Sequence, residues 1–450
     1  MRFVATPEPR IQIEGNYTLK NTGNRTLDQL ELRLPGRRFA SNELQASWDG
    51  KPVPLGASPT RLRNALLTPR EPWRISARHT LRLTREFLPA EQSETSLSFS
   101  DDAFFLPAAG WNAELLPPVG LFASGGTPPK RWDLLVAVPT RFEVHTSGLQ
   151  KKSKQKKGET VTVAEQGKGD PYPFVIAGRY HTAGIGTGGE KLHLWTRQGQ
   201  ESAKLREVSE ALARVTAAYD ATFGERSKPS SQIWIVECPV VAGCFTNLSP
   251  LRAELLGRNE NERATAEMIS QDTLVVDVSG GALTVAGGSA PSLAASWLGY
   301  AQNPAFFEQK PPLTMLPVFA AAIGRDAASG ADSREETIRR ALRLIPANAK
   351  PEKVEDPNVV RAKSFLFFYA LQDRYGREAF RKATQHMLYA RQGKGFELDD
   401  LIAAFEEETH QNVAEFVRTW MKRPGVPKEF RTRYEGAAAA NVHSIKEKTP

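Results

Sequence analysis

The stretch Pro291-Ser292-Leu293-Ala294-Ala295-Ser296-Trp297-Leu298-Gly299 is the most informative part of this 450-residue sequence. It offers nothing to a metal ion, because proline and alanine have no side-chain lone pair and a serine hydroxyl is too weakly basic to accept a proton at neutral pH. No two of the seven histidines are separated by four residues, so the sequence contains no His-x-x-x-His zinc helix. The histidines are His79, His145, His181, His193, His386, His410 and His443.

Other segments accompany this stretch in a fixed order. Gly243-Cys244-Phe245-Thr246-Asn247 precedes it, and Arg361-Ala362-Lys363-Ser364 follows it. The C-terminal part then contains Tyr375 to Phe380, Phe396 to Phe405 and Trp420 to Pro427 (WMKRPGVP). From about residue 10 to residue 430, this succession resembles the M1 family of zinc aminopeptidases, which belong to the gluzincin group.

The resemblance assigns a family role to each position of the 291–299 stretch. The family motif there is E-L-A-H-Q-W-x-G, of which Trp297 and Gly299 are retained. In an H-E-x-x-H helix two histidines bind one zinc ion and the glutamate between them activates the bound water. In that frame Pro291 and Ala295 replace the two histidines, and Ser292 replaces the general base.

The other landmarks lack their reactive groups as well. Gly243 and Asn247 match the ends of the family's G-A-M-E-N motif, but Thr246 replaces the glutamate that binds the substrate's amino terminus. Arg361 replaces the tyrosine that stabilises the tetrahedral oxyanion. The segment Leu316 to Ala320, with Pro317, matches the one that carries the third zinc ligand, and no acid lies between Gln309 and Arg325. The sequence therefore predicts a metal-free site with no zinc, no cofactor and no hydrolytic activity.

The resemblance implies a multidomain α+β fold. Its parts are an N-terminal antiparallel β-sandwich over residues 1–187, a thermolysin-like α/β lobe over 188–330 and a helical subdomain over 331–435. The Ala-rich and Lys-rich composition that follows predicts a flexible tail over 436–450. Period-two patterning predicts strands in the first part, and Glu114 is expected on a loop, either solvated or facing ligand. The expected elements are a hairpin of Arg10 to Glu14 and Tyr17 to Lys20, strands at Thr80–Thr84, Trp132–Val138, Ile233–Val236 and Thr273–Val278, a helix at Ser202–Phe223, and turns at Gly280-Gly281 and Gly287-Gly288.

Composition limits the function classes. Hydrophobic residues make up 40% and charged residues 24%, as in globular proteins. No apolar run approaches the length of about 18 residues that a membrane span needs. The net charge of +8, from 59 basic and 51 acidic residues, indicates only a mild preference for anionic partners.

The run Lys151-Lys152-Ser153-Lys154-Gln155-Lys156-Lys157-Gly158 is the strongest charge feature. It lies between two expected strands, which predicts a hairpin tip. One interpretation is a solvated loop, and the other is contact with anionic lipid head groups or an acidic protein. Nucleic acid is not expected as a partner, because no aromatic residues lie between the lysines to stack on bases.

Two questions about compartment and redox state stay open in the sequence. The first residues lack the apolar stretch of a secretory signal, although a strand pattern begins so early that residues upstream of Met1 could be missing. By resemblance alone, the β-rich N-terminal layout is typical of bacterial envelope or periplasmic proteins. Cys238 and Cys244 could form a disulfide or remain two buried free thiols.

Three hypotheses for function follow. The first is a non-catalytic scaffold that binds a protein or peptide, as a subunit of a larger assembly. The second is an enzyme with residual or altered activity, whose groups would come from Cys244, His193, Glu237 and Glu254. The third is docking on an anionic membrane surface through the lysine run.

Overall fold

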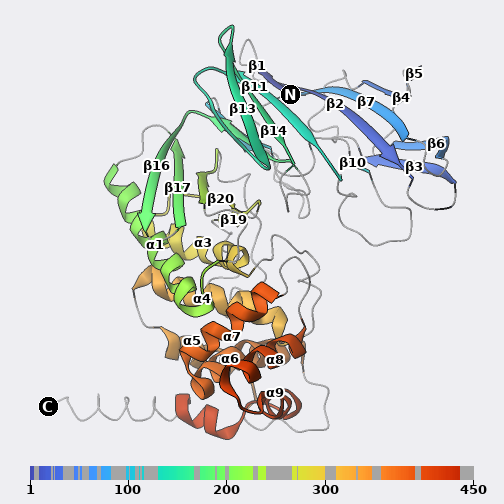
Figure 1. Ribbon diagram of the computed structural model, residues 1–450. Coiled ribbons are helices and arrows are strands. Elements are labelled where there is room, and N and C mark those ends of the chain that lie inside the picture. Colours follow the sequence, from blue (N-terminus) through green and yellow to red (C-terminus); the bar gives the residue numbers. More distant parts are fainter. Residues whose placement is uncertain are drawn as a thin grey trace. The chain divides into compact units, whose positions relative to one another are not determined.

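The computed structural model describes most of the chain and divides it into two compact units (Figure 1). Unit 1 comprises Met1–Thr182, Thr196–Gln198 and Cys238–Cys244, and unit 2 comprises Ala183–Trp195, Gly199–Glu237 and Phe245–Pro450. No helix among the described residues is long and apolar enough to cross a membrane. The described residues are 1–4, 10–21, 24, 26–33, 45–48, 51–52, 60–67, 72–82, 98–100, 102–106, 111, 114–115, 130–166, 173–187, 190–197, 202–226, 232–239, 266–270, 272–298, 311–330, 333–346, 356–390 and 397–435.

Unit 1 is built from β-strands. Its largest sheet has the order β13-β14-β11-β1-β2-β7-β4-β5, and two smaller sheets have the orders β10-β3-β6 and β12-β15-β9-β8. Alternate residues of the large sheet, such as Ile11, Ile13, Val136 and Val138, point into a core that also contains Phe104. The strands are β1 (Arg2–Val4), β2 (Arg10–Lys20), β3 (Leu27–Arg33), β4 (Gln45–Trp48), β5 (Lys51–Pro52), β6 (Thr60–Leu67), β7 (Pro72–Arg82), β8 (Ser98–Phe99), β9 (Ala103–Leu106), β10 (Glu114–Leu115), β11 (Asp133–Pro139), β12 (Glu143–Thr146), β13 (Leu149–Lys156), β14 (Glu159–Glu165) and β15 (Val175–Gly178).

Two predictions for this unit were wrong in detail. The expected hairpin is one continuous strand, β2, which pairs with β7 along its whole length. Gly15 does not turn the chain, and it leaves room for the ring of Tyr17, which a side chain at residue 15 would overlap. Glu114 lies in the short strand β10, opposite Arg33 of β3, and not on a loop.

Unit 2 begins with a five-stranded sheet of order β16-β17-β18-β20-β19. Strands β17, β18 and β20 are parallel, and β19 runs antiparallel to β20 at one edge. Strands β18 and β20 are mostly apolar, whereas β17 combines buried Leu192 and Leu194 with charged residues at its ends. The bounds are β16 (Tyr180–Thr187), β17 (Glu190–Arg197), β18 (Gln232–Glu237), β19 (Ala266–Met268) and β20 (Thr273–Val276).

Helix α3 (Ala282–Trp297) packs on β19 and β20 of this sheet, and helices α1 (Ser202–Phe223), α3 and α4 (Leu316–Ser329) pack on one another. The predicted helix over Ser202–Phe223 is confirmed, and its buried Val208, Leu212 and Val215 follow the 3.6-residue period. The expected first turn lies directly before α3, with Gly281 as the N-cap residue. Gly287 and Gly288 lie inside α3, so the prediction of a second turn was wrong.

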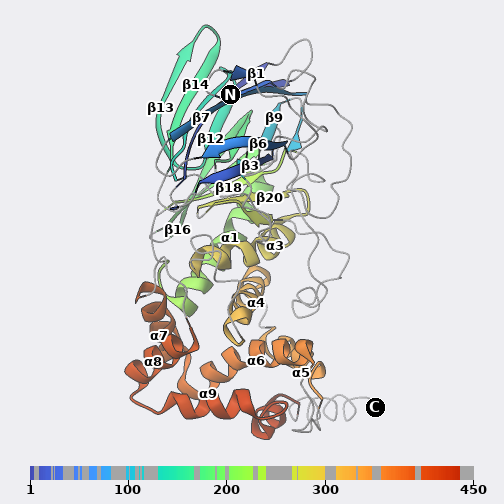
Figure 2. The ribbon, with the colours of Figure 1, turned by 90° about the vertical axis from the view of Figure 1, so that its right-hand side faces the viewer.

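The C-terminal region is helical, as predicted (Figure 2). Helix α6 has a capping residue at each end. The Asp356 side chain accepts a hydrogen bond from Asn358 N at its start, and Gly376 ends it with φ 88°. One hydrophobic core contains residues from Leu192 to Tyr434. The helices are α5 (Arg334–Arg343), α6 (Pro357–Tyr375), α7 (Arg377–Ala390), α8 (Leu398–Thr409) and α9 (Val413–Lys422).

These parts together confirm the α+β fold: a β-rich N-terminal region, a mixed α/β region and a helical C-terminal region.

Candidate functional site

Helix α3 carries the three positions that the sequence motif matches to two metal ligands and the general base. Pro291 and Ala295 are one helical turn apart and therefore share a face of the helix. Pro291 is buried, whereas Ser292 and Ala295 are partly buried. The hydroxyl of Ser292 donates a hydrogen bond of 3.3 Å to the carbonyl oxygen of Ala266 on the edge strand β19. The one polar side chain of the three thus joins a helix to a strand.

The helix continues through Pro291 although proline lacks an N–H donor. In an α-helix the lost hydrogen bond would go to the carbonyl of residue i−4, which here is Gly287. Glycine at this position leaves open space, since an added methyl group would find only the Cγ of Arg325, at 4.0 Å. The neighbouring Ser289 hydroxyl donates to the carbonyl of Val285 at 2.7 Å. The helix segment around the proline is thus built from small residues, and one of them carries a side-chain hydrogen bond to the helix backbone.

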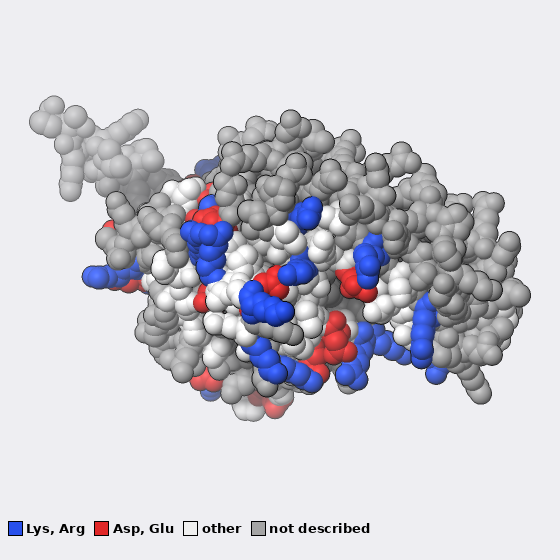
Figure 3. Space-filling view, turned by 90° about the horizontal axis from the view of Figure 1, so that it is seen from above, with Lys and Arg blue, Asp and Glu red and all other residues white. Residues whose placement is uncertain are grey.

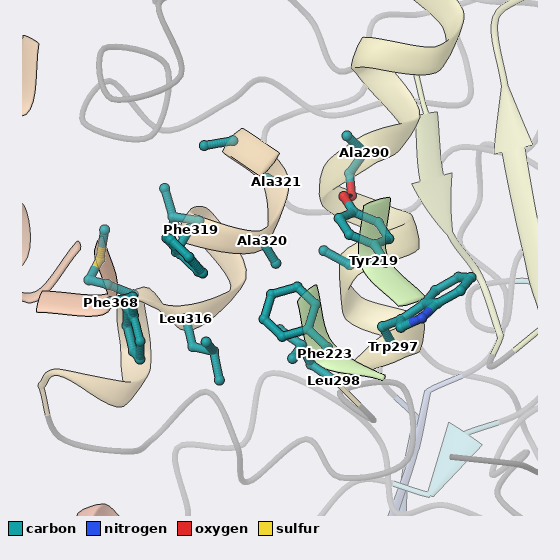
Figure 4. Packing of buried hydrophobic residues seen from close by; sticks show 14 of the residues in the cluster. Tyr219, Phe223, Ala290, Trp297, Leu298, Leu316, Phe319, Ala320, Ala321 and Phe368 are labelled. Carbon is teal, nitrogen blue, oxygen red and sulfur yellow. Dashed lines mark hydrogen bonds between the residues drawn. The ribbon is translucent and has the colours of Figure 1, made fainter. Parts of the chain in front are cut away.

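Tyr219 of α1 and Gly324 of α4 fix the position of α3. The Tyr219 hydroxyl donates to the carbonyl of Ala290 at 2.6 Å, directly before Pro291 (Figure 4). Gly324 lets α4 approach closely, because a Cβ atom there would overlap the Tyr219 hydroxyl and lie 2.9 Å from the Cβ of Ala290. The rings of Tyr219 and Trp297 are also in contact, with centroids 5.4 Å apart. The site helix is therefore held by tight packing and one buried hydrogen bond.

Helix α4 contributes packing at the position expected for the third ligand. Pro317 lies in its first turn and is partly buried, and Leu316, Phe319 and Ala320 are buried in the common core (Figure 4). Among the residues that the structure describes, no group of three histidine, cysteine, aspartate or glutamate side chains could hold a metal ion.

Comparison with solved structures gives the fold of this arrangement. An M1 zinc metallopeptidase from Deinococcus radiodurans, solved as a point mutant bound to a Tyr-Ser-Ala substrate, matches 95% of this chain and 93% of its own, with a TM-score of 0.53 and 15% identity. Aminopeptidase A from Legionella pneumophila, in complex with aspartic acid, matches 92% of this chain and 48% of its own, with a TM-score of 0.51 and 12% identity. No protein-family model and no curated protein matches the sequence.

The chain has the M1 metallopeptidase fold. The recognition made from the sequence landmarks is confirmed at the level of fold, over 95% of the chain. At 15% identity the likeness concerns the backbone architecture. The chemistry open to this M1-fold chain depends on its own residues.

A polar cluster that sequence reasoning did not predict lies at the C-terminal end of α3. The indole Nε1 of Trp297 donates to Asp220 Oδ1 at 3.1 Å, and Arg226 Nη1 donates to Ser296 Oγ at 2.7 Å. The Arg226 guanidinium also lies 5.8 Å from the centre of the Trp297 ring. Burial raises the pKa of the Asp220 carboxyl above its ordinary value, while the hydrogen bond from Trp297 acts in the opposite direction. The hydrogen-bonded partners are 77 and 70 residues apart in the chain, so their spacing gave no signal.

Arg361 lies exposed in the first half of α6. Its neighbour Lys363 is only 1% exposed, and its ammonium group donates to the backbone carbonyls of Met421, at 3.2 Å, and Arg423. These carbonyls lie at the C-terminal end of α9, where a cation satisfies acceptors that the helix leaves free. Lys363 therefore joins α6 to α9, and Trp420 Nε1 adds a hydrogen bond of 3.3 Å to the Lys363 carbonyl.

The positions matched to the family's amine-binding motif, Gly243, Thr246 and Asn247, lie outside the described residues, as do Cys244 and Glu254.

Cys238 is buried and disulfide-bonded, which excludes the interpretation of two free thiols. Of the other groups considered for residual chemistry, His193 stacks on Trp234 with ring centres 4.4 Å apart. Glu237 is buried at the end of β18.

The lysine run forms a strand, so the prediction of a hairpin tip was wrong for most of it. Lys151, Lys152, Lys154 and Lys156 lie in β13, the edge strand of the eight-stranded sheet, and only Lys157 and Gly158 form the turn. Both turn residues have positive φ, 50° and 78°, as a two-residue hairpin turn of type I′ requires. Pairing with β14 overrides the low strand propensity of lysine, and Lys151 forms an ion pair of 2.5 Å with Glu165 of β14.

Proposed function

We propose that this chain is a non-catalytic protein of M1 fold that binds a protein or a peptide, as a subunit of a larger assembly. The observation that carries the proposal is helix α3, which keeps its packing and offers a buried proline, a serine and an alanine at the positions matched to the ligands and the base. A catalytic zinc ion needs three protein ligands, and aliphatic side chains cannot serve as ligands.

The packing around α3 supports the same proposal. Tyr219, Gly324 and Trp297 form a dense interior that holds the helix in place. A scaffold needs a stable surface and not a reactive centre, so the loss of catalytic groups without loss of core residues favours a binding role. The Deinococcus protein of M1 fold holds a Tyr-Ser-Ala peptide, which makes a peptide a reasonable ligand for this chain as well.

The first experiment separates this proposal from residual enzymology. The purified chain is incubated with zinc, dialysed, analysed for bound metal and assayed against aminoacyl anilides. We expect less than stoichiometric zinc and no turnover. Stoichiometric zinc together with hydrolysis would establish an enzyme and contradict the proposal. Ser292→Ala is the matched variant, since it removes the only polar side chain of the three positions on α3 and should leave both results unchanged.

The second experiment tests the assembly. Cross-linking in native extract identifies partners, and each purified partner is then mixed with the chain and sized by light scattering. We expect a complex of defined stoichiometry. A chain that remains a solitary monomer with every purified partner, and that retains no peptide from a library, would count against a scaffold.

The lysines of strand β13 and of the turn after it favour a second candidate function, docking on an anionic membrane surface. Lys154 is exposed on the edge strand β13, and Lys157 is exposed at the turn. Against this candidate, Glu165 pairs with Lys151, and basic and acidic side chains are interspersed on the face shown in Figure 3. Co-sedimentation with vesicles of phosphatidylserine and phosphatidylcholine tests it, at low and at physiological salt. Docking would require binding that falls with salt and weakens in Lys154→Glu but not in Lys422→Glu.

A further inference from the structure

A polar pocket of about 490 Å³ lies in the helical region of unit 2, and none of its lining residues belongs to α3 or α4. It forms where α5 begins, where α6 ends and where α7 begins. Its size is within the range of pockets that hold small molecules, roughly 300–1,000 Å³. The lining residues are Arg334, Glu335, Gln372, Asp373, Gly376, Arg377, Arg433 and Tyr434.

The floor of the pocket is a fixed hydrogen-bond network. Arg334 donates to Gln372 Oε1 and to Asp373 Oδ1, both at 2.6 Å, and its guanidinium lies 4.9 Å from the centre of the Tyr369 ring. The Tyr434 hydroxyl donates to Asp373 Oδ2 at 2.5 Å. The side chains of Arg334 and Asp373 are only 15% and 13% exposed. This floor is therefore preorganised, and the Asp373 carboxylate already accepts from two donors.

The rim of the pocket carries an excess of positive charge. Arg433 approaches Asp373 at 3.5 Å but remains 60% exposed. Glu335 is engaged by Arg339, at 2.6 Å, which does not line the pocket. Arg377 is exposed and, among the described residues, has no acidic side chain within ion-pair distance. The two acidic residues that line the pocket, Glu335 and Asp373, thus each have a basic partner. The guanidinium group of Arg377 is therefore available to a ligand.

We propose that this pocket binds a small oxyanion ligand, one that carries a phosphate group or several carboxylates. A guanidinium group presents parallel N–H donors that match phosphate and carboxylate oxygens, and such charge-assisted pairs are among the stronger hydrogen bonds. Arg377 and Arg433 supply these donors from different helical segments that line the same pocket. The proposal does not depend on whether α3 is inactive or whether the chain binds a protein.

The test measures binding of sodium phosphate and of sodium citrate to the full chain by calorimetric titration, with sodium chloride at matched ionic strength as the reference. Wild type should bind at least one of the two oxyanions and should not bind chloride. Arg377→Gln should bind about tenfold more weakly, because it loses one charge-assisted contact. Arg377 is exposed and outside the floor network, so this variant should fold normally, and circular dichroism checks it.

Two further variants sharpen the result. Arg433→Gln should weaken the same oxyanion, whereas Arg418→Gln, an exposed arginine of α9 that does not line the pocket, should bind like wild type. A preference for phosphate or for citrate would tell which oxyanion chemistry the pocket accepts. Equal affinity in wild type, Arg377→Gln and Arg433→Gln, or no binding of either anion beyond that of chloride, would overturn the proposal.

Discussion

The hydroxyl of Tyr219 donates a hydrogen bond of 2.6 Å to the carbonyl oxygen of Ala290. Tyr219 is fully buried, and burial raises the pKa of its hydroxyl well above the ordinary value, so the group stays protonated and remains a donor. The bond joins α1 to α3 one residue before Pro291, where the helix loses an internal hydrogen bond. It therefore ties α1 to α3 directly before the proline.

Tyr219→Phe should lower the free energy of unfolding by about 1–2 kcal/mol, because the ring remains in place and only the buried hydrogen bond is lost. Scanning calorimetry measures the change. Tyr389→Phe is the matched control, since its hydroxyl makes an exposed contact of 3.4 Å with the Glu225 carbonyl and its loss should change little. Equal effects of the two substitutions would contradict the role given to Tyr219.

Gly324→Ala should destabilise the chain by about 1–3 kcal/mol through overpacking. The added methyl group would overlap the Tyr219 hydroxyl and press on Ala290. Gly287→Ala, also in a buried helix, meets open space and should be neutral or stabilising by up to about 1 kcal/mol. Denaturant unfolding of both variants gives the comparison, and a neutral Gly324→Ala would show that α4 can move away from α3.

Lys363→Met should lower the free energy of unfolding by about 2–4 kcal/mol. The methionine would fill the same space, but the carbonyls of Met421 and Arg423 would lose their buried cationic donor. Lys422→Met, one residue beyond Met421 and exposed, provides a control with the same change of side chain. We expect thermal unfolding to separate the two clearly, and similar melting temperatures would argue that Lys363 is not needed at the end of α9.

Asp220 should make the protein less stable as the pH rises through the acid range. The pKa of its carboxyl is raised in the folded chain, mainly by burial, so the unfolded chain loses the proton first and unfolding becomes more favourable as the pH rises. Asp220→Asn keeps an acceptor for Trp297 Nε1 and has no charge to bury. The variant should therefore be more stable than wild type at neutral pH, and the difference should shrink below about pH 4.

Unfolding of both proteins across this pH range measures the difference. A difference that does not change with pH would show that the ionisation of Asp220 plays no part in it.

Much of the fold could be predicted because local pattern and family landmarks agree. The helix over Ser202–Phe223 has a regular apolar stripe, and the strands around Trp132–Val138 and Ile233–Val236 are short apolar runs between turns. The order of landmarks then placed these elements in the M1 fold, which the comparisons with solved structures confirm.

The errors arose where tertiary contacts override local preference. Gly287 and Gly288 look like a turn, yet they lie within α3, whose place is fixed by the packing of α1 and α4. The lysines of β13 look like a loop, yet pairing with β14 makes them a strand. The contacts of Trp297 with Asp220 and of Arg334 with Asp373 join residues distant in sequence, and no spacing rule reveals them.

The shared core of residues from Leu192 to Tyr434 has a consequence for dissection of the molecule. Phe319 of α4 touches Phe368, Tyr369 and Phe380, with ring centres 4.8 to 5.7 Å apart, so the apolar surface of the α/β region is completed by α6 and α7. A fragment that stops at residue 330 would expose these rings to water and should aggregate. Unit 2 therefore has to be expressed whole, and its helices cannot be transferred to another protein as an independent module.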